Sequence, residues 1–385
     1  MQLDLKKAFD RLKHSAVLAA LRSQGASVQC IAVFAALLRD TKASVSLSGV
    51  TADPMNLKRG LPQGAPESPV LFTLVTDMVL KRLIKNWKEK GLGWNFDGFT
   101  LLAVCYDDDI LLFASSQQSL EAMVSDVIDA FLEVGLEVGM DKSHWTSFPA
   151  KPGSKLKCGT SRVKWEDHLT FIGTVLNFCG NDGLAIEYRL AQATKVFYKW
   201  KDVLQCEAAS VKLRVELGMS TFMSAAMWLA ETWHPTAAQV QRLNSWAARM
   251  MARLARIKPL RQESIGDYWR RLHRFGHHCM DGIGGSLEVY RRGKLHAFAG
   301  HLARMQDGIV SIALRTRCLA WWRAAQSHQI FRHPARFHPW RWEQQLEDFF
   351  GQARTLFIDD NVGWMQRAED RGVWRRTREV FAKSV

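Results

Sequence analysis

The sequence has 385 residues, 47% of them hydrophobic and 23% charged, which is enough for two or three folded units with well-filled cores. This composition excludes an intrinsically disordered chain. The apolar runs, such as residues 70–75, are far shorter than the about 20 residues that cross a bilayer, so no membrane association is expected.

The first residues mix Lys6 and Lys7 with Asp4 and Asp10, and they contain no apolar segment of the kind that directs secretion. The seven cysteines are scattered and no two are at C-x-x-C spacing, which argues against a disulfide framework and a structural zinc site. We therefore expect a protein of the nucleus or cytoplasm that is not secreted.

The net charge of +14 indicates a polyanionic partner, and the charge is unevenly distributed. Residues 1–150 contain 15 Lys and Arg against 17 Asp and Glu, whereas residues 151–385 contain 37 against 21. The N-terminal part therefore has the character of a site built from acids, and the C-terminal part that of a surface that binds phosphates. The alternative for the C-terminal part is a basic extension of a common, non-specific kind.

The first 190 residues mix helical and strand patterns. Apolar residues recur at helical spacing over residues 14–38 (interrupted near Gly25), 70–90 and 120–134. Alternating or continuous apolar residues predict strands near 45–47 and over 99–106 and 110–114.

From about residue 190 the pattern is helical throughout. Amphipathic helices are predicted over 190–204, 210–231 and 239–257, followed by stretches rich in Trp and Arg. Helix breaks are expected near Gly153, His234–Pro235, Pro259, Gly282–Gly285 and His333–Pro339. The fold class expected is therefore α+β, with an antiparallel sheet and helices first and an all-α region after it.

Three consecutive carboxylates, Asp107, Asp108 and Asp109, separate the two apolar runs and mark the turn of a hairpin. Two like charges about 4 Å apart repel by roughly 4 kcal/mol at an effective dielectric constant of 20, so a cation is expected to neutralise them. Hard oxygen ligands suit Mg²⁺. The alternative is an ordinary solvated turn, because Asp is common in turns.

Two further segments carry polar groups of interest. Asp4 and Asp10 lie six positions apart, and alone they could be no more than the charged start of a helix. Residues 60–69 form a loop rich in Gly and Pro before an apolar helix, in which Gly64 permits a close backbone approach and Gln63 offers both a donor and an acceptor. Alone, this loop could be a simple turn.

Taken in order, these segments resemble the palm motifs of non-LTR (LINE-type) retrotransposon reverse transcriptases. Residues 4–14 are similar to the D-x-x-K-A-F-D-x-x-x-H motif of that family, and residues 63–72 to its Q-G-x-x-x-S-P-x-L-F motif. Tyr106–Asp109 resembles its [FY]-A-D-D hairpin, residues 135–143 its G-L-x-x-N-x-x-K-T segment, and Phe171–Gly173 its F-L-G strand. The resemblance covers about residues 1–175.

The resemblance implies roles for particular residues. Asp4 and Asp108 would be the main ligands of two Mg²⁺ ions, with Asp109 assisting. Phe9 would lie beneath the sugar and select deoxynucleotides, Gln63 and Gly64 would contact the incoming nucleotide, and Lys142 would neutralise or protonate the pyrophosphate. For Gln63 and Lys142 the alternatives are a surface amide and a surface lysine.

The function that the resemblance implies is RNA-directed DNA polymerisation, in which a dNTP is joined to a DNA primer on an RNA template. The expected domains are a palm over residues 1–190, a helical thumb over 191–260 and a basic helical region over 261–385. Group II intron and telomerase-type reverse transcriptases share the palm, but the K-A-F-D and Q-G-x-x-x-S-P details favour the retrotransposon lineage.

Three departures from the family pattern stand out. Asp107 replaces the small residue usual before the catalytic pair, and Gly139 stands where the family usually has Asn. No counterpart of the family's fingers precedes Asp4 in the sequence. The alternative is therefore a truncated, catalytically inactive remnant that still binds nucleic acid.

The basic C-terminal half contains candidates for phosphate contacts, because Arg binds phosphate bidentately and Trp offers a stacking surface. After residue 240 there are 26 Lys and Arg against 13 Asp and Glu, with eight Trp. The alternative is that most of these Trp fill helix-packing cores and that many Arg are only solvated. A zinc knuckle from the scattered histidines after residue 240 is disfavoured by their irregular spacing. The candidate arginines are Arg270, Arg271, Arg291, Arg292, Arg375 and Arg376.

Overall fold

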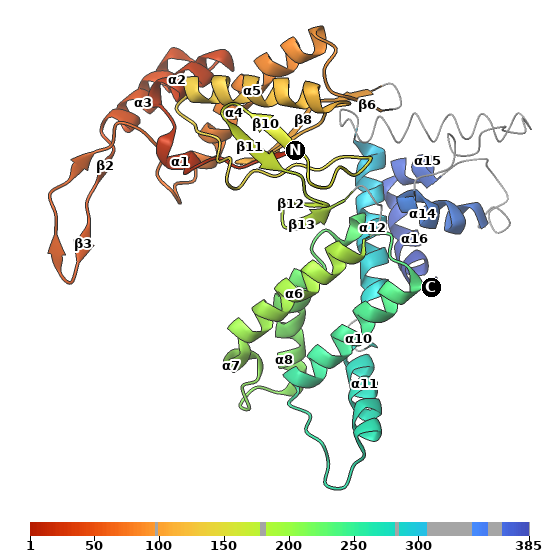
Figure 1. The fold of residues 1–385 in the computed structure, drawn as a ribbon. Coiled ribbons are helices and arrows are strands. Elements are labelled where there is room, and N and C mark those ends of the chain that lie inside the picture. The colour runs from red at the N-terminus through yellow and green to blue at the C-terminus, as the bar shows by residue number, and fades with distance from the viewer. Residues whose placement is uncertain (97–98, 178–181, 282–284, 306–340, 353–363, 385) are drawn as a thin grey trace, which may run out of the picture. The chain divides into compact units, whose positions relative to one another are not determined.

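A computed structural model describes residues 1–96, 99–177, 182–281, 285–305, 341–352 and 364–384 (Figure 1). The chain divides into two compact units, Met1–Phe178 and Cys179–Val385. The first combines antiparallel strands with helices and the second is helical in its described parts, which confirms the fold class expected from the sequence. Among the described helices, none is both long enough and apolar enough to span a membrane.

The centre of the first unit is a three-stranded antiparallel sheet in the order β1-β9-β8. Its strands are β1 (Gln2–Leu3), β8 (Ala103–Tyr106) and β9 (Asp109–Leu112). The middle strand, β9, has a continuous apolar run, and its residues 110–112 are all buried. A central strand covered on both faces needs such a run. The predicted hairpin is therefore confirmed.

Five helices belong to this unit. Apolar residues of α4 and α5 recur at helical spacing and are buried in the same core as the sheet, which explains why these segments fold as helices. The interruption predicted near Gly25 is confirmed, because Gly25 has φ +75° and the Ser27 side chain caps the next helix at the backbone N–H of Cys30. The helices are α1 (Ala8–Arg11), α2 (His14–Ser23), α3 (Val28–Arg39), α4 (Ser68–Glu89) and α5 (Gln117–Glu133).

Five pairings of short antiparallel strands are also described in this unit, and two of them form one ribbon that projects from it in Figure 1. The single strand predicted over 99–106 is divided, because the buried Leu102 separates β7 from β8. The pairs are β2 (Lys42–Ala43) with β5 (Met55–Asn56), β3 (Ser46–Leu47) with β4 (Val50–Thr51), β6 (Trp94–Phe96) with β7 (Phe99–Leu101), β10 (Lys155–Cys158) with β11 (Ser161–Lys164), and β12 (Leu169–Phe171) with β13 (Thr174–Leu176).

The described elements of the second unit are helical. They are α6 (Gly183–Lys199), α7 (Lys201–Leu204), α8 (Val211–Gly218), the π-helix η1 (Met219–Met223), α9 (Ser224–Ala226), the 3-10 turn η2 (Ala230–Thr232), α10 (Ala237–Leu254), α11 (Ile265–Asp281), α12 (Leu287–Arg304), α14 (Arg341–Gln352), α15 (Trp364–Glu369) and α16 (Arg371–Lys383).

The helix predicted over 210–231 is not continuous. It passes from α8 through η1 to α9 and ends before Leu229, whose φ is +58°. The hydroxyls of Ser220, Thr221 and Ser224 donate to carbonyls three or four residues earlier, a pattern that competes with the helix hydrogen bonds and bends helices. The break expected at His333–Pro339 lies outside the described residues.

Two apolar clusters hold this unit together. The first joins α6, α8 and α10 around Phe197, Phe222 and Trp246, and the second joins α12, α15 and α16 around Trp364 and Trp374. These tryptophans are buried. For them, the expectation that Trp fills helix-packing cores is confirmed.

Candidate active site

Asp4 directly follows β1, and the register of the sheet decides its neighbours. Gln2 pairs with Leu111 and Leu3 with Ile110, so the next position along β1 faces Asp109 at the start of β9. The strand is only two residues long, but backbone hydrogen bonds from Gln2 to His144 and from Gly139 to Asp4 hold its other edge. Residues about a hundred positions apart are thereby brought together.

The β8–β9 turn presents the other acids. Tyr106 pairs with Asp109, so Asp107 and Asp108 form a two-residue turn and Asp109 belongs to the strand. Asp107 has φ +53°, a left-handed conformation that Asp tolerates better than most residues. Asp109 accepts a hydrogen bond from the Gln2 side chain at 3.4 Å.

The pKa values show that the acids share one electrostatic environment. Burial raises the pKa of Asp4, Lys142 opposes that rise, and the charge of Asp108 adds to it. Burial likewise raises the pKa of Asp109. The hydrogen bond from Gln2 lowers this pKa, and the charges of Asp108 and Asp4 raise it further. Three carboxylates from two distant segments thus repel one another at one edge of the sheet.

Asp107 is affected differently. Burial raises its pKa first, followed by the charges of Asp108 and Asp109, and Asp4 is not among the causes. The same three turn acids act on the Cys105 thiol. Burial, together with the charges of these acids, raises the pKa of the thiol to about 11. Cys105 is therefore a protonated thiol at neutral pH.

The donor set fits a divalent cation, because the charge of Asp108 raises the pKa of Asp4 and Asp109, and a shared positive charge would offset that repulsion between hard carboxylate ligands. Among the described residues, no three His, Cys, Asp or Glu side chains are arranged to enclose an ion. Mg²⁺ commonly takes only one or two protein carboxylates and fills its remaining positions with water and substrate phosphates, so a closed protein cage is not required.

Gly139 and Ser143 hold Asp4 from the side opposite β9. The Asp4 N–H donates to the Ser143 Oγ at 3.2 Å, and that hydroxyl donates to the Gly139 carbonyl at 2.8 Å. A Cβ at position 139 would lie 2.9 Å from the Asp4 Oδ2, so any side chain there would displace the carboxylate. This contact gives a physical reason for the departure at Gly139. The positioning role of Ser143 was not predicted from the sequence, where it was noted only as part of a motif.

The loop before α4 is attached to the first motif. The Leu61 N–H donates to the Phe9 carbonyl at 2.7 Å, and the Gln63 Nε2 donates to the Asp10 Oδ1 at 3.1 Å. Gly60 is required here, because its φ is +88° and a Cβ would lie 2.8 Å from the Asp10 carbonyl oxygen. The Phe9 ring stacks on Phe72 of α4, with the ring centroids 4.9 Å apart.

These contacts bring the candidate nucleotide-binding residues into one region. Phe9 is half-buried, whereas Gln63 and Gly64 are exposed, and Gly64 has φ +90° with no atom within 4 Å of a Cβ. The His14 ring lies 3.0 Å from the Gly60 carbonyl oxygen and supports the same loop. The first motif and the loop are thus joined by several contacts near Asp10, including a further hydrogen bond from the Gly60 N–H to the Leu12 carbonyl at 2.8 Å.

The candidate arginines of the second unit differ from one another. Arg270 is exposed and pairs with Asp267 on its own helix, and Arg271 is bound by both oxygens of Glu263. The prediction for Arg291 was wrong: its side chain is 1% exposed and makes a bidentate pair with Glu288, so it presents no guanidinium to an external phosphate. Arg292 is half-buried beside Phe381, whereas Arg375 and Arg376 are exposed.

Comparison with known proteins bears on the first unit. Residues 1–176 match the family model described as reverse transcriptase (RNA-dependent DNA polymerase). The chain is 31% identical over 169 residues to the Pol polyprotein of an R2 retrotransposable element from Nasonia vitripennis, a match that covers 44% of this chain and 15% of the relative. The corresponding R2 polyprotein of Drosophila melanogaster is 30% identical over 156 residues, covering 40% of this chain and 14% of the relative.

Two further matches extend beyond the first unit. A transposon-derived protein of Caenorhabditis elegans is 26% identical over 285 residues, which is 72% of this chain and 95% of that protein. The solved structure of apo telomerase from Candida tropicalis covers 77% of this chain and half of its own, with 13% identity and a TM-score of 0.36. A likeness at that level does not define the fold.

Residues 1–176 are therefore similar to the reverse transcriptase family and to the Pol polyproteins of R2 retrotransposable elements. The matched stretch spans only about 15% of the length of the R2 polyproteins.

Proposed function

We propose that this chain is an RNA-directed DNA polymerase that joins dNTPs to a primer 3′-hydroxyl. The observation that supports the proposal is electrostatic: the charge of Asp108 raises the pKa of both Asp4 and Asp109, and the charge of Asp4 raises the pKa of Asp109. Carboxylates held close together at one end of a sheet lower the stability of the fold unless a cation neutralises them, so such a cluster indicates a functional site. The RNA template, the DNA primer and the dNTPs are the partners that this activity requires.

In this proposal Asp4 and Asp108, assisted by Asp109, would hold two Mg²⁺ ions. When bound, the ions would lower the pKa of the primer hydroxyl and stabilise charge on the triphosphate and the leaving pyrophosphate. Gly139 and Ser143 keep the Asp4 backbone in place, so that its carboxylate need not reorganise when substrate arrives.

The chain's other residues would bind and orient the nucleotide. Phe9, backed by Phe72, offers a flat surface that excludes a 2′-hydroxyl, and Gln63, held by Asp10, offers polar atoms beside it. Lys142, whose charge lowers the pKa of Asp4, would offset charge on a departing pyrophosphate or donate its proton to it.

Primer extension on an RNA template with Mg²⁺ and dNTPs tests the proposal. We expect Asp108→Ala to abolish extension, because the shared ligand is lost, and Asp107→Asn to retain it. Extension undiminished by Asp108→Ala would overturn the assignment. Substitution of Phe9 by Val should in addition admit ribonucleotides, which a parallel reaction with NTPs would detect.

A second candidate is a protein that binds nucleic acid without polymerising it. It is favoured by the charge of residues 151–385, with 37 Lys and Arg against 21 Asp and Glu, and by the extra acid at position 107. Salt-sensitive binding of RNA without incorporation of dNTPs by the unaltered chain would select this candidate over the first.

A further inference from the structure

The second unit contains a polar cleft of about 820 Å³. Its walls come from α10, α11, α12 and α14 and from the segment before α10. The volume lies within the roughly 300–1,000 Å³ that is usual for sites that bind small molecules. None of the residues that line the cleft belongs to the reverse transcriptase domain at 1–176.

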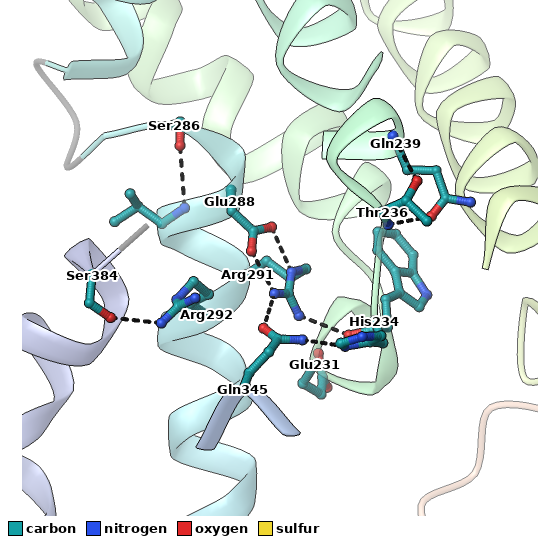
Figure 2. Close-up of polar contacts among 12 residues, drawn as sticks. Glu231, His234, Thr236, Gln239, Ser286, Glu288, Arg291, Arg292, Gln345 and Ser384 are labelled. Carbon is teal, nitrogen blue, oxygen red and sulfur yellow. Dashed lines mark hydrogen bonds and ion pairs between the residues drawn. The ribbon is translucent and has the colours of Figure 1, made fainter. Parts of the chain in front are cut away.

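One wall of the cleft is a chain of hydrogen bonds from Glu288 to His234, drawn in Figure 2. Both oxygens of Glu288 accept from Arg291, at 2.7 and 2.6 Å. Arg291 also donates to the Gln345 Oε1 at 2.5 Å, and the Gln345 Nε2 lies 2.8 Å from the His234 Nδ1.

This chain determines which way each polar group faces. A guanidinium can only donate, so the oxygen of Gln345 must face Arg291 and its amide nitrogen must donate to His234. The His234 Nδ1 therefore accepts, which leaves the proton of the neutral ring on Nε2. Because Arg291 and Glu288 are both buried, this wall is organised before any ligand arrives.

The described lining of the cleft holds two arginines, Arg291 and Arg292, against one carboxylate, so its formal charge is positive. Among the described residues that line the cleft, Glu288 carries the one carboxylate, and both of its oxygens accept from Arg291. Arg292 donates to the Phe381 carbonyl at 3.1 Å and to the Ser384 Oγ at 2.7 Å, and it lies 4.5 Å from the Phe381 ring, all of them uncharged partners. Burial lowers the pKa of Arg292, the charge of Glu288 opposes that shift, and the charge of Arg291 adds to it. An anion beside Arg292 would further favour its charged form.

The opposite walls offer flat rings and an acceptor. His273 and His277 lie one turn apart on α11, with ring centroids 6.3 Å apart, and burial followed by the charges of His277 and Arg249 lowers the pKa of His273. His273 is therefore a neutral aromatic ring at neutral pH. On α10, the Asn244 Oδ1 is buried and has no donor among the residues that the structure describes.

We propose that this cleft binds one phosphate-bearing nucleotide of a single-stranded nucleic acid. Arg292 supplies the charge for the phosphate, the His273 and His277 rings face the base, and the Asn244 Oδ1 accepts from a base N–H. Among the residues that the structure describes, these histidines are not part of any group of three potential ligands that could hold an ion. The choice of nucleic acid as the ligand rests on the proposed function, but binding here needs no polymerisation.

The test uses the full chain and a fluorescein-labelled 12-nucleotide oligouridylate, with binding followed by anisotropy at fixed salt and without dNTPs. We expect His277→Ala and Asn244→Leu each to weaken binding by about fivefold, the lower end of what loss of one base contact costs. His278→Ala is the matched control, because His278 is the exposed neighbour on the same helix and does not line the cleft. It should bind like the unaltered chain.

A second measurement guards against misfolding of a variant. The same strand carrying 4-thiouridine should crosslink under ultraviolet light to the segments 234–245 or 273–277 of the unaltered chain, as read by mass spectrometry. Crosslinks confined to other segments, or equal affinity of all three variants, would overturn the proposal. A second outcome would also overturn the proposal: uridine monophosphate binds in a way that depends on His277, while binding of the strand does not depend on His277. The cleft would then be assigned to free nucleotides. The Asp108→Ala variant, which we expect to lose primer extension, should bind the strand as the unaltered chain does. Failure of the polymerase proposal can therefore be told apart from failure of the cleft proposal.

Discussion

At the scale of single residues, the acidic turn combines electrostatic and backbone strain. Asp107 has a left-handed backbone, and its carboxylate adds to the repulsion around Asp108 without acting on Asp4. Gly139, on the other side of the site, provides the space that the Asp4 carboxylate occupies. Both departures from the family pattern are therefore compatible with a site in which Asp4 and Asp108 act together.

Asp107→Gly should stabilise the first unit. Glycine adopts a positive φ without a Cβ penalty, which for most residues is about 1 kcal/mol or more, although its greater freedom in the unfolded chain offsets part of the gain. We expect a small rise in the thermal midpoint, measured by circular dichroism. Asp107→Ala removes the same charge but keeps the Cβ, so it separates the two causes; a larger rise for Ala than for Gly would contradict the backbone explanation.

The acids also predict how stability depends on pH. The folded-state pKa values of Asp4 and Asp109 are raised above the ordinary 3.8, so the folded chain holds more protons than the unfolded chain between that value and the raised pKa. Their contribution to stability is thus fully present below pH 3.8 and is lost as pH rises through the raised values. Asp108→Asn removes one cause of the shift and should stabilise the protein more at pH 7 than at pH 4, as compared by thermal unfolding without Mg²⁺.

Gly139→Ala should reduce the rate of primer extension more than it reduces stability. The added Cβ would approach the Asp4 Oδ2 to 2.9 Å, and the flexible carboxylate can turn away at little cost to folding. We expect a fall in kcat with the thermal midpoint nearly unchanged. If the rate stays at the level of the unaltered chain, Asp4 is not held where the proposal needs it.

At the scale of elements, periodicity predicted the helices α4, α5 and α10 and the β8–β9 hairpin, because their apolar faces are buried in the way the pattern assumes. It did not predict the break within 210–231, where the apolar spacing continues while the hydroxyls of Ser220, Thr221 and Ser224 alter the backbone. Nor could it detect the division of 99–106, since Leu102 is as apolar and as buried as a strand residue.

The packing of α10 against α11 gives a prediction at this scale. A Cβ at Gly276 would lie 2.4 Å from the Ala248 Cα, so Gly276→Ala must separate the two helices and should lower the thermal midpoint markedly. Gly266, at the start of the same helix, has nothing nearer than the Ser264 Oγ at 3.8 Å. Gly266→Ala should leave the midpoint unchanged or slightly raise it, because Ala is the better helix former. Equal effects of the two substitutions would show that the close approach is not structural.

At the scale of the whole molecule, sequence motifs indicated which acids lie near one another, but they did not indicate which arginines are buried. Asp4, Asp108 and Asp109 belong to motifs whose order constrains their positions, and the sheet register brings them together. The environment of Arg291 depends on Trp233 and Gln345, which are 58 and 54 residues away and give no local signal. A surface arginine and a buried one look alike until such partners are known.

The uneven charge predicts salt-dependent binding by the full chain. Residues 151–385 carry most of the Lys and Arg, and each phosphate contact releases counterions, so affinity for single-stranded RNA should fall at least tenfold between about 50 and 200 mM salt. A plot of log Kd against log salt concentration measures the number of contacts. A flat plot would remove electrostatics as the main source of affinity.

The near contact of Gly276 with Ala248 has a consequence for ligand choice. Gly276 is next to His277 on α11, and Ala248 is one helical turn from Asn244 on α10. The close approach of the two backbones therefore sets the distance between the α10 and α11 walls of the cleft, and this distance cannot increase to fit a thicker ligand. We expect flat heterocycles to bind between these walls, whereas saturated sugars or branched aliphatic groups of equal volume should be excluded because they are too thick.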